Sequence, residues 1–291
     1  MNKLDFQTAL DSKRVLLMDG AMGSELLRAG LPAGTPCEVW NLTHSEKVRA
    51  IHRDYVEAGA DCLVTNTFLA SPPWLGRHGL ADKLEEITAA AIELARQAAG
   101  PDRFVLASVG PLGDDPEYLD ACLRRMLPVL NEADAILFET WSVIELIDVL
   151  RSIDAPGRLP WLVSFAYRPG LDPHSFELEA GMSPQQIAEA CTDVVAALGM
   201  NCGLAVDLAA SAAILRAYRV KTSLPLLVRP NAGTPVEVNK QWIYPCTAAD
   251  FAGGLPGLLE AGAALIGGCC GSTPAHIAAL RPIIDDWNKS R

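Results

Sequence analysis

Short apolar runs alternate with amphipathic segments along this chain of 291 residues. The apolar runs are typical of buried strands, and the segments between them repeat apolar residues at helical spacing. Several of these segments open at a Ser or Thr typical of a helix N-cap, as at Ser45, Ser183, Thr247 and Thr273. Eight strands are predicted, over Val15–Asp19, Cys62–Thr67, Phe104–Val109, Ala135–Glu139, Trp161–Phe165, Ala197–Asn201, Leu226–Arg229 and Ala264–Gly267. The predicted helices cover Glu46–Ala58, Leu80–Ala99, Tyr118–Leu130, Val143–Arg151, Pro184–Ala196, Ala210–Arg219, Ala248–Glu260 and Pro274–Trp287.

The number of strand and helix units predicts the fold. Eight units in 291 residues give about 36 residues each, the size of one strand-helix repeat. We therefore predict an α/β protein, a single (β/α)8 TIM barrel that forms one domain over residues 1–291. An open doubly wound sheet is the alternative, but its Gly-x-Gly-x-x-Gly is absent after the first strand. The longest irregular segment, Tyr167–Gly181, is predicted to be a loop over the barrel mouth.

Composition and charge narrow the class of protein. Half of the residues are hydrophobic, and the formal net charge is -11. No block of Lys or Arg could neutralise phosphates, so a nucleic acid is not an expected partner. We find neither a signal-peptide pattern nor an apolar stretch of about 18 residues, so a cytoplasmic protein with no membrane partner is expected. The eight cysteines are then expected to be reduced.

Two adjacent cysteines in a glycine run, Cys269 and Cys270, follow the apolar stretch Ala263–Ile266. Neighbouring cysteines do not close an unstrained disulfide, whereas thiolates at a strand end suit a thiophilic metal such as zinc. Cys202 follows another apolar run, and three cysteines without a fourth would leave one zinc position open for substrate. The alternative is that these cysteines are small buried hydrophobic residues. That interpretation is preferred for Cys37, Cys62, Cys122, Cys191 and Cys246.

Polar side chains stand where the predicted strands end, at Asp19, Thr65, Glu139, Asn201 and Asn231. Because barrel active sites form at the carboxyl ends of strands, we expect these side chains around one mouth. A buried carboxylate needs a cation or hydrogen-bond donors, and the α-amino group of a substrate supplies both. Asp19 and Glu139 are therefore candidate amine ligands. Asp19 could instead cap a turn or helix, and Thr65 and Asn231 could be simple strand-end and turn residues.

Nearly the whole chain resembles the homocysteine S-methyltransferase family of zinc-dependent barrels. The most specific part of the match is Asn201-Cys202 followed by Gly267-Gly268-Cys269-Cys270-Gly271. The other matching segments are Met18-Asp19-Gly20-Ala21-Met22-Gly23, Glu57-Ala58-Gly59-Ala60-Asp61, Thr65-Asn66-Thr67-Phe68, Val109-Gly110-Pro111, Phe138-Glu139-Thr140, Arg229-Pro230-Asn231-Ala232-Gly233 and Ser272-Thr273-Pro274.

The resemblance implies a transfer of a methyl group to the thiol of homocysteine, giving methionine. It implies Zn²⁺ on Cys202, Cys269 and Cys270, with Asp19 and Glu139 on the amino group of homocysteine. Neighbouring backbone amides would hold the carboxylate. The expected substrate site is completed by Gly20, Thr65 and Asn201.

The expected methyl donor is a small sulfonium, S-methylmethionine or S-adenosylmethionine. Betaine enzymes of the family hold their donor in an aromatic cage, but two cage positions are Leu69 and Thr140 here. Three tryptophans, Trp74, Trp141 and Trp242, could line a sulfonium pocket or simply pack in the barrel.

Other interpretations remain open. One is a homocysteine-activating subunit that takes its methyl group from a corrinoid partner protein, and a homo-oligomer is also possible. A barrel isomerase or aldolase would need a lysine at a strand end, and Lys221 and Lys240 lie outside the predicted ends. A non-catalytic zinc or thiol sensor would leave Asp19 and Glu139 unexplained.

Overall fold

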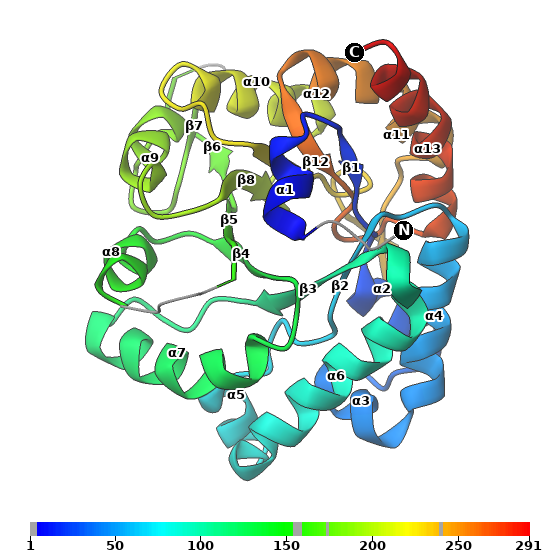
Figure 1. The fold of residues 1–291 in the computed structure, drawn as a ribbon, viewed down its shortest axis with the longest axis vertical. Coiled ribbons are helices and arrows are strands. Elements are labelled where there is room, and N and C mark those ends of the chain that lie inside the picture. The colour runs from blue at the N-terminus through cyan, green and yellow to red at the C-terminus, as the bar shows by residue number, and fades with distance from the viewer. Residues whose placement is uncertain (1–4, 154–158, 173–174, 239–240) are drawn as a thin grey trace.

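The computed structural model describes residues 5–153, 159–172, 175–238 and 241–291. Eight parallel strands pair in the order β1-β12-β9-β8-β5-β4-β3-β2. A parallel bridge between Met18 and Cys62 joins β1 to β2, so the sheet closes into a barrel surrounded by helices (Figure 1). The predicted (β/α)8 barrel is confirmed. Its strands are β1 (Leu16–Leu17), β2 (Cys62–Val64), β3 (Phe104–Val109), β4 (Ala135–Trp141), β5 (Trp161–Phe165), β8 (Ala197–Asn201), β9 (Leu226–Arg229) and β12 (Ala263–Ile266).

Four strands, β3, β5, β8 and β9, run over the predicted residues. The first two strands are shorter than predicted, although the Asp19 amide still donates to the Cys62 carbonyl and the Thr65 amide to the Leu106 carbonyl, both at 3.0 Å. Strand β4 instead continues past Glu139 to Trp141, with a register shift against β5 between Phe138 and Trp141.

The helices surround the barrel, and most match the predicted segments. Predicted helix Ala248–Glu260 divides at Gly254, where a Cβ would stand 2.6 Å from Leu208 Cδ1. Predicted helix Pro184–Ala196 ends early, because the Ala196 amide already bonds to Trp161 in β5. The longer helices are α4 (Ser45–Glu57), α6 (Leu84–Ala99), α7 (Pro116–Leu130), α8 (Glu145–Ser152), α9 (Pro184–Cys191), α10 (Leu208–Arg219) and α13 (Pro274–Lys289). The shorter ones are α1 (Phe6–Asp11), α2 (Met22–Arg28), α3 (Trp40–Thr43), α5 (Pro72–Arg77), α11 (Ala248–Gly253) and α12 (Leu255–Glu260), with 3-10 turns η1 (Cys37–Val39), η2 (Ala81–Lys83) and η3 (Gly100–Asp102).

Three of the four predicted caps are confirmed. Ser183 and Thr247 each accept a backbone N–H at their helix start, and Thr273 shares a capping box with His276. The fourth prediction is wrong, because Ser45 is already helical, and His44 stands at the N-cap without a side-chain bond to the helix backbone.

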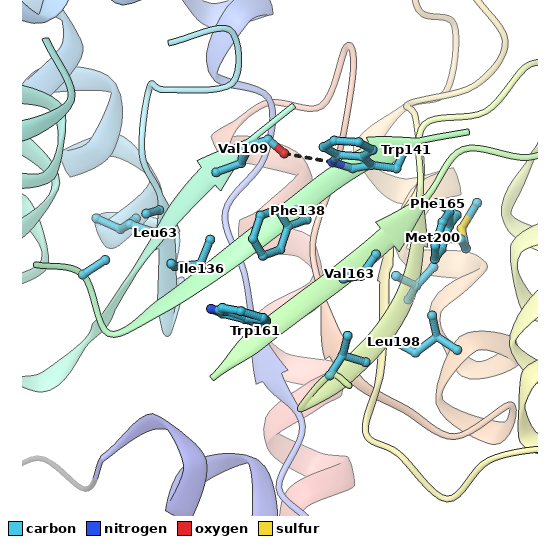
Figure 2. Close-up of a cluster of buried hydrophobic side chains, with 14 of the residues drawn as sticks. Leu63, Val109, Ile136, Phe138, Trp141, Trp161, Val163, Phe165, Leu198 and Met200 are labelled. Atoms are coloured by element: carbon cyan, nitrogen blue, oxygen red, sulfur yellow. Dashed lines mark hydrogen bonds between the residues drawn. The ribbon is translucent and has the colours of Figure 1, made fainter. Parts of the chain in front are cut away.

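Alternating strand residues build two core layers. Outward-facing residues such as Phe138, Trp161 and Val163 pack between the barrel and its helices (Figure 2). Inward-facing residues such as Leu106 and Leu137 fill the barrel. Helix α1, which the sequence analysis did not predict, packs its apolar side on this inner layer near the start of β3, where the ring centroids of Phe6 and Phe104 are 5.1 Å apart. The described chain contains no helix with the length and apolarity needed to span a membrane.

The same alternation brings polar side chains to the inner face at the carboxyl ends of the strands. In β4 the inner positions run Ala135, Leu137, Glu139, so the carboxylate follows two buried apolar residues. Equivalent inner positions at the upper ends of β3, β5, β8 and β9 are Ser108, Ser164, Asn201 and Arg229. The barrel therefore places a polar layer above an apolar one.

Two small hairpins extend the loops at this end of the barrel. Strands β6 (Arg168–Pro169) and β7 (Phe176–Glu177) pair within the predicted loop Tyr167–Gly181, of which residues 173–174 lie outside the described part. Strands β10 (Val236–Val238) and β11 (Gln241–Ile243) form a second hairpin that the sequence analysis did not predict.

Candidate active site

Three cysteines meet at the carboxyl ends of β8 and β12. Cys202 directly follows β8, and Cys269 and Cys270 follow the glycines after β12. Their sulfur atoms all lie within 4.8 Å of one another. Tetrahedral zinc with bonds of about 2.3 Å holds sulfur ligands about 3.8 Å apart, so only a small contraction would be needed. The donor set fits a single thiophilic ion.

Glycines and backbone bonds fix the position of the cysteine pair. Gly271 has φ +79°, and a Cβ there would lie 2.1 Å from Tyr244 Cγ, so no larger residue fits. The Cys269 amide donates to the Pro230 carbonyl at 2.8 Å, and the Cys270 carbonyl accepts from the Ala232 amide at 2.9 Å. The loop after β9 thus holds the loop after β12.

The three thiols share their protons unequally. Hydrogen bonds from Cys269 and then Cys270 lower the pKa of Cys202 well below that of an ordinary thiol. The same hydrogen bonds raise the pKa of Cys269 and of Cys270, because their protons are held by the Cys202 sulfur. A cation at the centre of the cluster would favour the thiolate form of all three cysteines.

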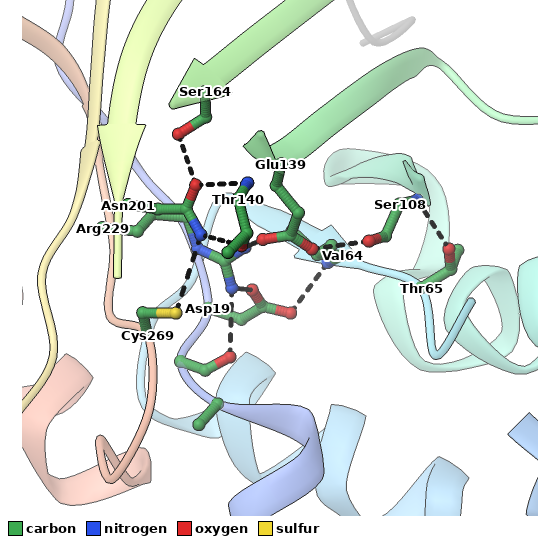
Figure 3. A network of polar contacts seen from close by, with 12 residues as sticks. Asp19, Val64, Thr65, Ser108, Glu139, Thr140, Ser164, Asn201, Arg229 and Cys269 are labelled. Carbon is green, nitrogen blue, oxygen red and sulfur yellow. Dashed lines mark hydrogen bonds and ion pairs between the residues drawn. The ribbon is translucent and has the colours of Figure 1, made fainter. Parts of the chain in front are cut away.

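A buried ion-pair network lies beside the cysteines (Figure 3). Arg229 donates from Nη1 to Glu139 Oε2 at 2.8 Å and from Nη2 to Asp19 Oδ1 at 3.2 Å. The free oxygens are also used, since Asp19 Oδ2 accepts from the Val64 amide at 2.8 Å and Glu139 Oε1 accepts from Ser108 Oγ at 2.5 Å. The two predicted amine ligands are therefore brought together, and Arg229 is a partner that the sequence analysis missed.

The charges of this network do not balance. Two carboxylates face one guanidinium, so full ionisation leaves one excess negative charge among side chains that are at most 10 % exposed. Burial raises the pKa of Asp19 to about 7, even though Arg229 acts in the opposite direction. Burial likewise raises the pKa of Glu139. A second cation, such as a substrate ammonium group, would remove this imbalance.

Asn201 connects the ion-pair network to the cysteines. Its Oδ1 accepts from the Thr140 amide at 2.8 Å and from Ser164 Oγ at 2.7 Å, while Nδ2 donates to Thr140 Oγ1 at 2.7 Å. Nδ2 also lies 3.7 Å from Cys269 Sγ. Thr140 has φ +64°, a left-handed conformation that costs about 1–2 kcal/mol for a residue with a side chain. The Asn201 side chain holds this turn beside Glu139.

Thr65 and Gly20 line the same cavity as the cysteines. Both also make contacts within the protein that support its structure. Thr65 Oγ1 accepts from the Ser108 amide at 3.1 Å and shares a hydrogen bond of 2.6 Å with Thr67. Its hydroxyl therefore joins the loop after β2 to β3. Gly20 offers its carbonyl to Arg229 Nη2 at 3.2 Å, and a Cβ at Gly20 would lie 2.8 Å from Ser272 Oγ.

One cavity of about 300 Å³ joins these groups. Glu139 and Arg229 of the ion-pair network line it together with all three cysteines of the cluster, whereas Asp19 and Asn201 are not among the lining residues. The rest of its lining comes from the segment after β1, from η1, from β2 and the segment after it, and from β4: Gly20, Ala21, Met22, Gly23, Ser24, Cys37, Glu38, Val64, Thr65, Asn66, Phe68, Leu69 and Thr140.

Two cysteine predictions need correction. Cys62, Cys122 and Cys191 are buried as predicted, but Cys37 and Cys246 are only half-buried. Cys37 is partly accessible because it belongs to η1 and lines the cavity.

Neither Trp74 nor Trp141 lines the cavity. Trp141 lies in the outer core and donates from Nε1 to the Val109 carbonyl at 3.2 Å, and Trp74 is not among the cavity residues. The side chain of Trp242 lies outside the described part of the structure.

Two further polar residues at the cysteine cluster were given no role by the sequence analysis. Tyr244, just after β11, hydrogen-bonds Cys270, and its burial followed by the Cys270 charge raises the pKa of the phenol. Asn231 hydrogen-bonds Cys202, while its buried Oδ1 has no hydrogen-bond partner among the described residues.

Comparisons with known proteins identify the family of this chain. The model of the homocysteine S-methyltransferase family matches residues 16–284. The chain belongs to that family. It is 32% identical to the homocysteine S-methyltransferase of Escherichia coli over 94% of this chain and 96% of that protein. The metallated form of the homocysteine methyltransferase MmuM from Escherichia coli has a similar structure, with a TM-score of 0.78, 28% identity and coverage of 96% of this chain and 100% of that one.

Another group of relatives is much longer. The chain is 35% identical to the methionine synthase of Mycobacterium tuberculosis over 91% of its own length, but this match covers only 24% of that protein. This chain therefore spans about a quarter of the length of the methionine synthases it matches.

Proposed function

We propose that this protein transfers a methyl group from a small sulfonium to the thiol of homocysteine, giving methionine. The observation that carries the proposal is the shared cavity, because the three thiols line it together with Glu139 and Arg229, and Arg229 pairs Glu139 with a second buried carboxylate, Asp19. An amino acid with a thiol side chain matches both ends of this arrangement. Residues 1–291 would act as one homocysteine-binding barrel.

Zinc is the metal we assign to Cys202, Cys269 and Cys270. The set consists only of sulfur donors, their spacing suits one tetrahedral ion, and three protein ligands leave a fourth position for substrate. When bound, zinc keeps an incoming thiol deprotonated at neutral pH and leaves its sulfur nucleophilic. The barrel already packs a full core without the metal, so the apo protein is expected to stay folded.

The carboxylate pair orients homocysteine. The ammonium group of homocysteine would lie against Asp19 and Glu139, where it offsets the excess negative charge and donates charge-assisted hydrogen bonds. Burial raises the pKa of both carboxylates, and Arg229 opposes this shift and holds them in place, while the backbone around Gly20 is available to the substrate carboxylate. With the ammonium group fixed at one point, the thiol can reach only a restricted part of the cavity, and this favours an in-line approach to the methyl group.

The transfer removes charge from the site. The homocysteine thiolate attacks the methyl carbon, the bond from that carbon to the donor sulfur breaks, and its electron pair stays on the donor as a neutral thioether. Because an anion and a cation combine into neutral products, exclusion of water favours the reaction. Apolar side chains of Met22, Phe68 and Leu69 line the cavity and exclude water from it. Leu69 and Thr140 provide no aromatic walls for a quaternary ammonium, which is why a sulfonium is preferred to betaine.

A methylcorrinoid partner protein is the second candidate donor. It is favoured by the 35% identity to a methionine synthase that is about four times longer than the matched segment. A non-catalytic thiol sensor is disfavoured, because it has no need of the buried carboxylates beside the thiols.

An activity screen tests the proposal. The zinc-loaded protein is incubated with homocysteine and, separately, S-methylmethionine, S-adenosylmethionine, betaine or a methylated corrinoid protein, and methionine is measured by mass spectrometry. We expect most methionine from S-methylmethionine and none above background from the Cys269→Ser variant. Turnover with the corrinoid protein alone would support the second candidate, and no turnover with any donor would contradict both.

A further inference from the structure

A third buried carboxylate lies at the same cavity. Glu38 belongs to the short turn η1, is only 2 % exposed and lines the cavity together with Leu69. Neither the sequence analysis nor the proposed mechanism uses it. Burying a carboxylate without a cationic partner destabilises the fold, because burial disfavours the charged form.

Only half of this carboxylate is satisfied. Glu38 Oε1 accepts from the Leu69 amide at 2.8 Å, whereas Oε2 is buried and has no hydrogen-bond partner among the residues that the structure describes. Burial accordingly raises the pKa of Glu38. The Asp19 and Glu139 carboxylates differ, since Arg229 pairs with both of them.

The fold around Glu38 does not depend on its charge. Asn66 Nδ2 donates to the Cys37 carbonyl and to Asn41 Oδ1, both at 2.9 Å, and Asn41 Nδ2 donates to the Asn66 carbonyl at 2.9 Å. These amides join η1 and α3 to the loop after β2. The one bond that Glu38 makes, to the Leu69 amide, needs only a carbonyl oxygen, which glutamine would also provide.

We propose that Glu38 binds the α-ammonium group of the methyl donor and so selects sulfonium donors that are amino acids. The inference rests on the proposed function. Homocysteine uses the carboxylates that Arg229 pairs, which leaves Glu38 as the unpaired anion for a second cationic ligand in the cavity. A sulfonium centre has no hydrogen to donate, whereas an ammonium group supplies both charge and N–H donors to Oε2.

The test compares two donors that differ in the amino group. S-methylmethionine carries an ammonium group, whereas dimethylsulfoniopropionate carries a sulfonium and a carboxylate but no amine. Steady-state kinetics at saturating homocysteine are measured for the zinc-loaded wild type, Glu38→Gln and the control Glu57→Gln, an exposed residue outside the cavity lining. For Glu38→Gln we expect kcat/KM to fall about tenfold or more with S-methylmethionine, mainly through KM, and less than about twofold with the amine-free donor.

The outcomes separate the inference from the proposed function. Equal losses with both donors, no loss with either, or a weakened affinity for homocysteine in Glu38→Gln would overturn the role of Glu38 while leaving the methyl transfer intact. A wild type inactive with both sulfonium donors would overturn the proposed function and this inference with it. If Glu38→Gln does not fold, the wild type decides, because a preference of less than about fivefold for S-methylmethionine contradicts the inference.

Discussion

Replacing Glu139 by glutamine removes one negative charge from the substrate site. The formal charge of the Asp19, Glu139 and Arg229 group changes from -1 to zero, while the amide still offers an oxygen to Arg229 and an NH2 group to Ser108 Oγ. The fold should therefore lose little, less than about 2 kcal/mol in free energy of unfolding. The excess negative charge that attracts the homocysteine ammonium group is gone.

The loss in affinity follows from the bond type. A hydrogen bond to a charged group contributes about 1.5–3 kcal/mol, so the dissociation constant of homocysteine should rise about tenfold to a hundredfold. Calorimetric titration of zinc-loaded Glu139→Gln measures this, with Glu57→Gln as the control that changes an exposed carboxylate. Zinc content should stay at one per chain. An unchanged homocysteine affinity, or a parallel loss of zinc, would refute the assignment of Glu139 to the substrate amine.

Three further outcomes are expected. Metal analysis of Cys269→Ser and Cys270→Ser should show loss of most zinc, since two thiolates hold it poorly, and full retention would contradict the ligand assignment. Asp19→Asn should change the pH dependence of stability: the pKa of Asp19 is about 7 in the fold against 3.8 ordinarily, so the fold favours the protonated acid. The stability of wild type relative to Asp19→Asn should thus be highest below pH 4 and fall by about 4 kcal/mol up to pH 7, as measured by urea unfolding. Chelation of zinc should leave the far-ultraviolet circular dichroism unchanged, and unfolding of the apo protein would show that the metal is structural.

The barrel could be predicted from the sequence because its strands are short, apolar and regularly spaced. The period of the apolar runs sets the number of strands, and the closing order follows from right-handed strand-helix connections. The ends of β1 and β2 were less predictable. The Thr65 amide still donates to the Leu106 carbonyl of β3, but the backbone turns directly after it, where the Thr67 amide donates to the Thr65 carbonyl.

The cysteine cluster could be predicted because its residues follow apolar runs and stand beside glycines. Arg229, the partner of the two carboxylates, was not predicted. Arg229 ends the apolar run of β9, and the alternation of that strand places it inward beside Glu139, although a charged residue at the end of an apolar run is equally typical of a solvent-exposed strand end. No sequence pattern pointed to Glu38, because the three residues of η1 show neither the alternation of a strand nor the periodicity of a helix. Its burial depends on the contact with the loop after β2, a tertiary feature.

Zinc-edge X-ray absorption of the protein with and without homocysteine tests the central claim most directly. The account predicts three sulfur ligands and one lighter atom in the substrate-free protein, and four sulfur ligands at about 2.3 Å once homocysteine is added. Loss of one sulfur in Cys202→Ser should accompany this result. A sulfur count that does not change on addition of homocysteine would contradict the claim that the three cysteines leave a position for the thiol of the substrate.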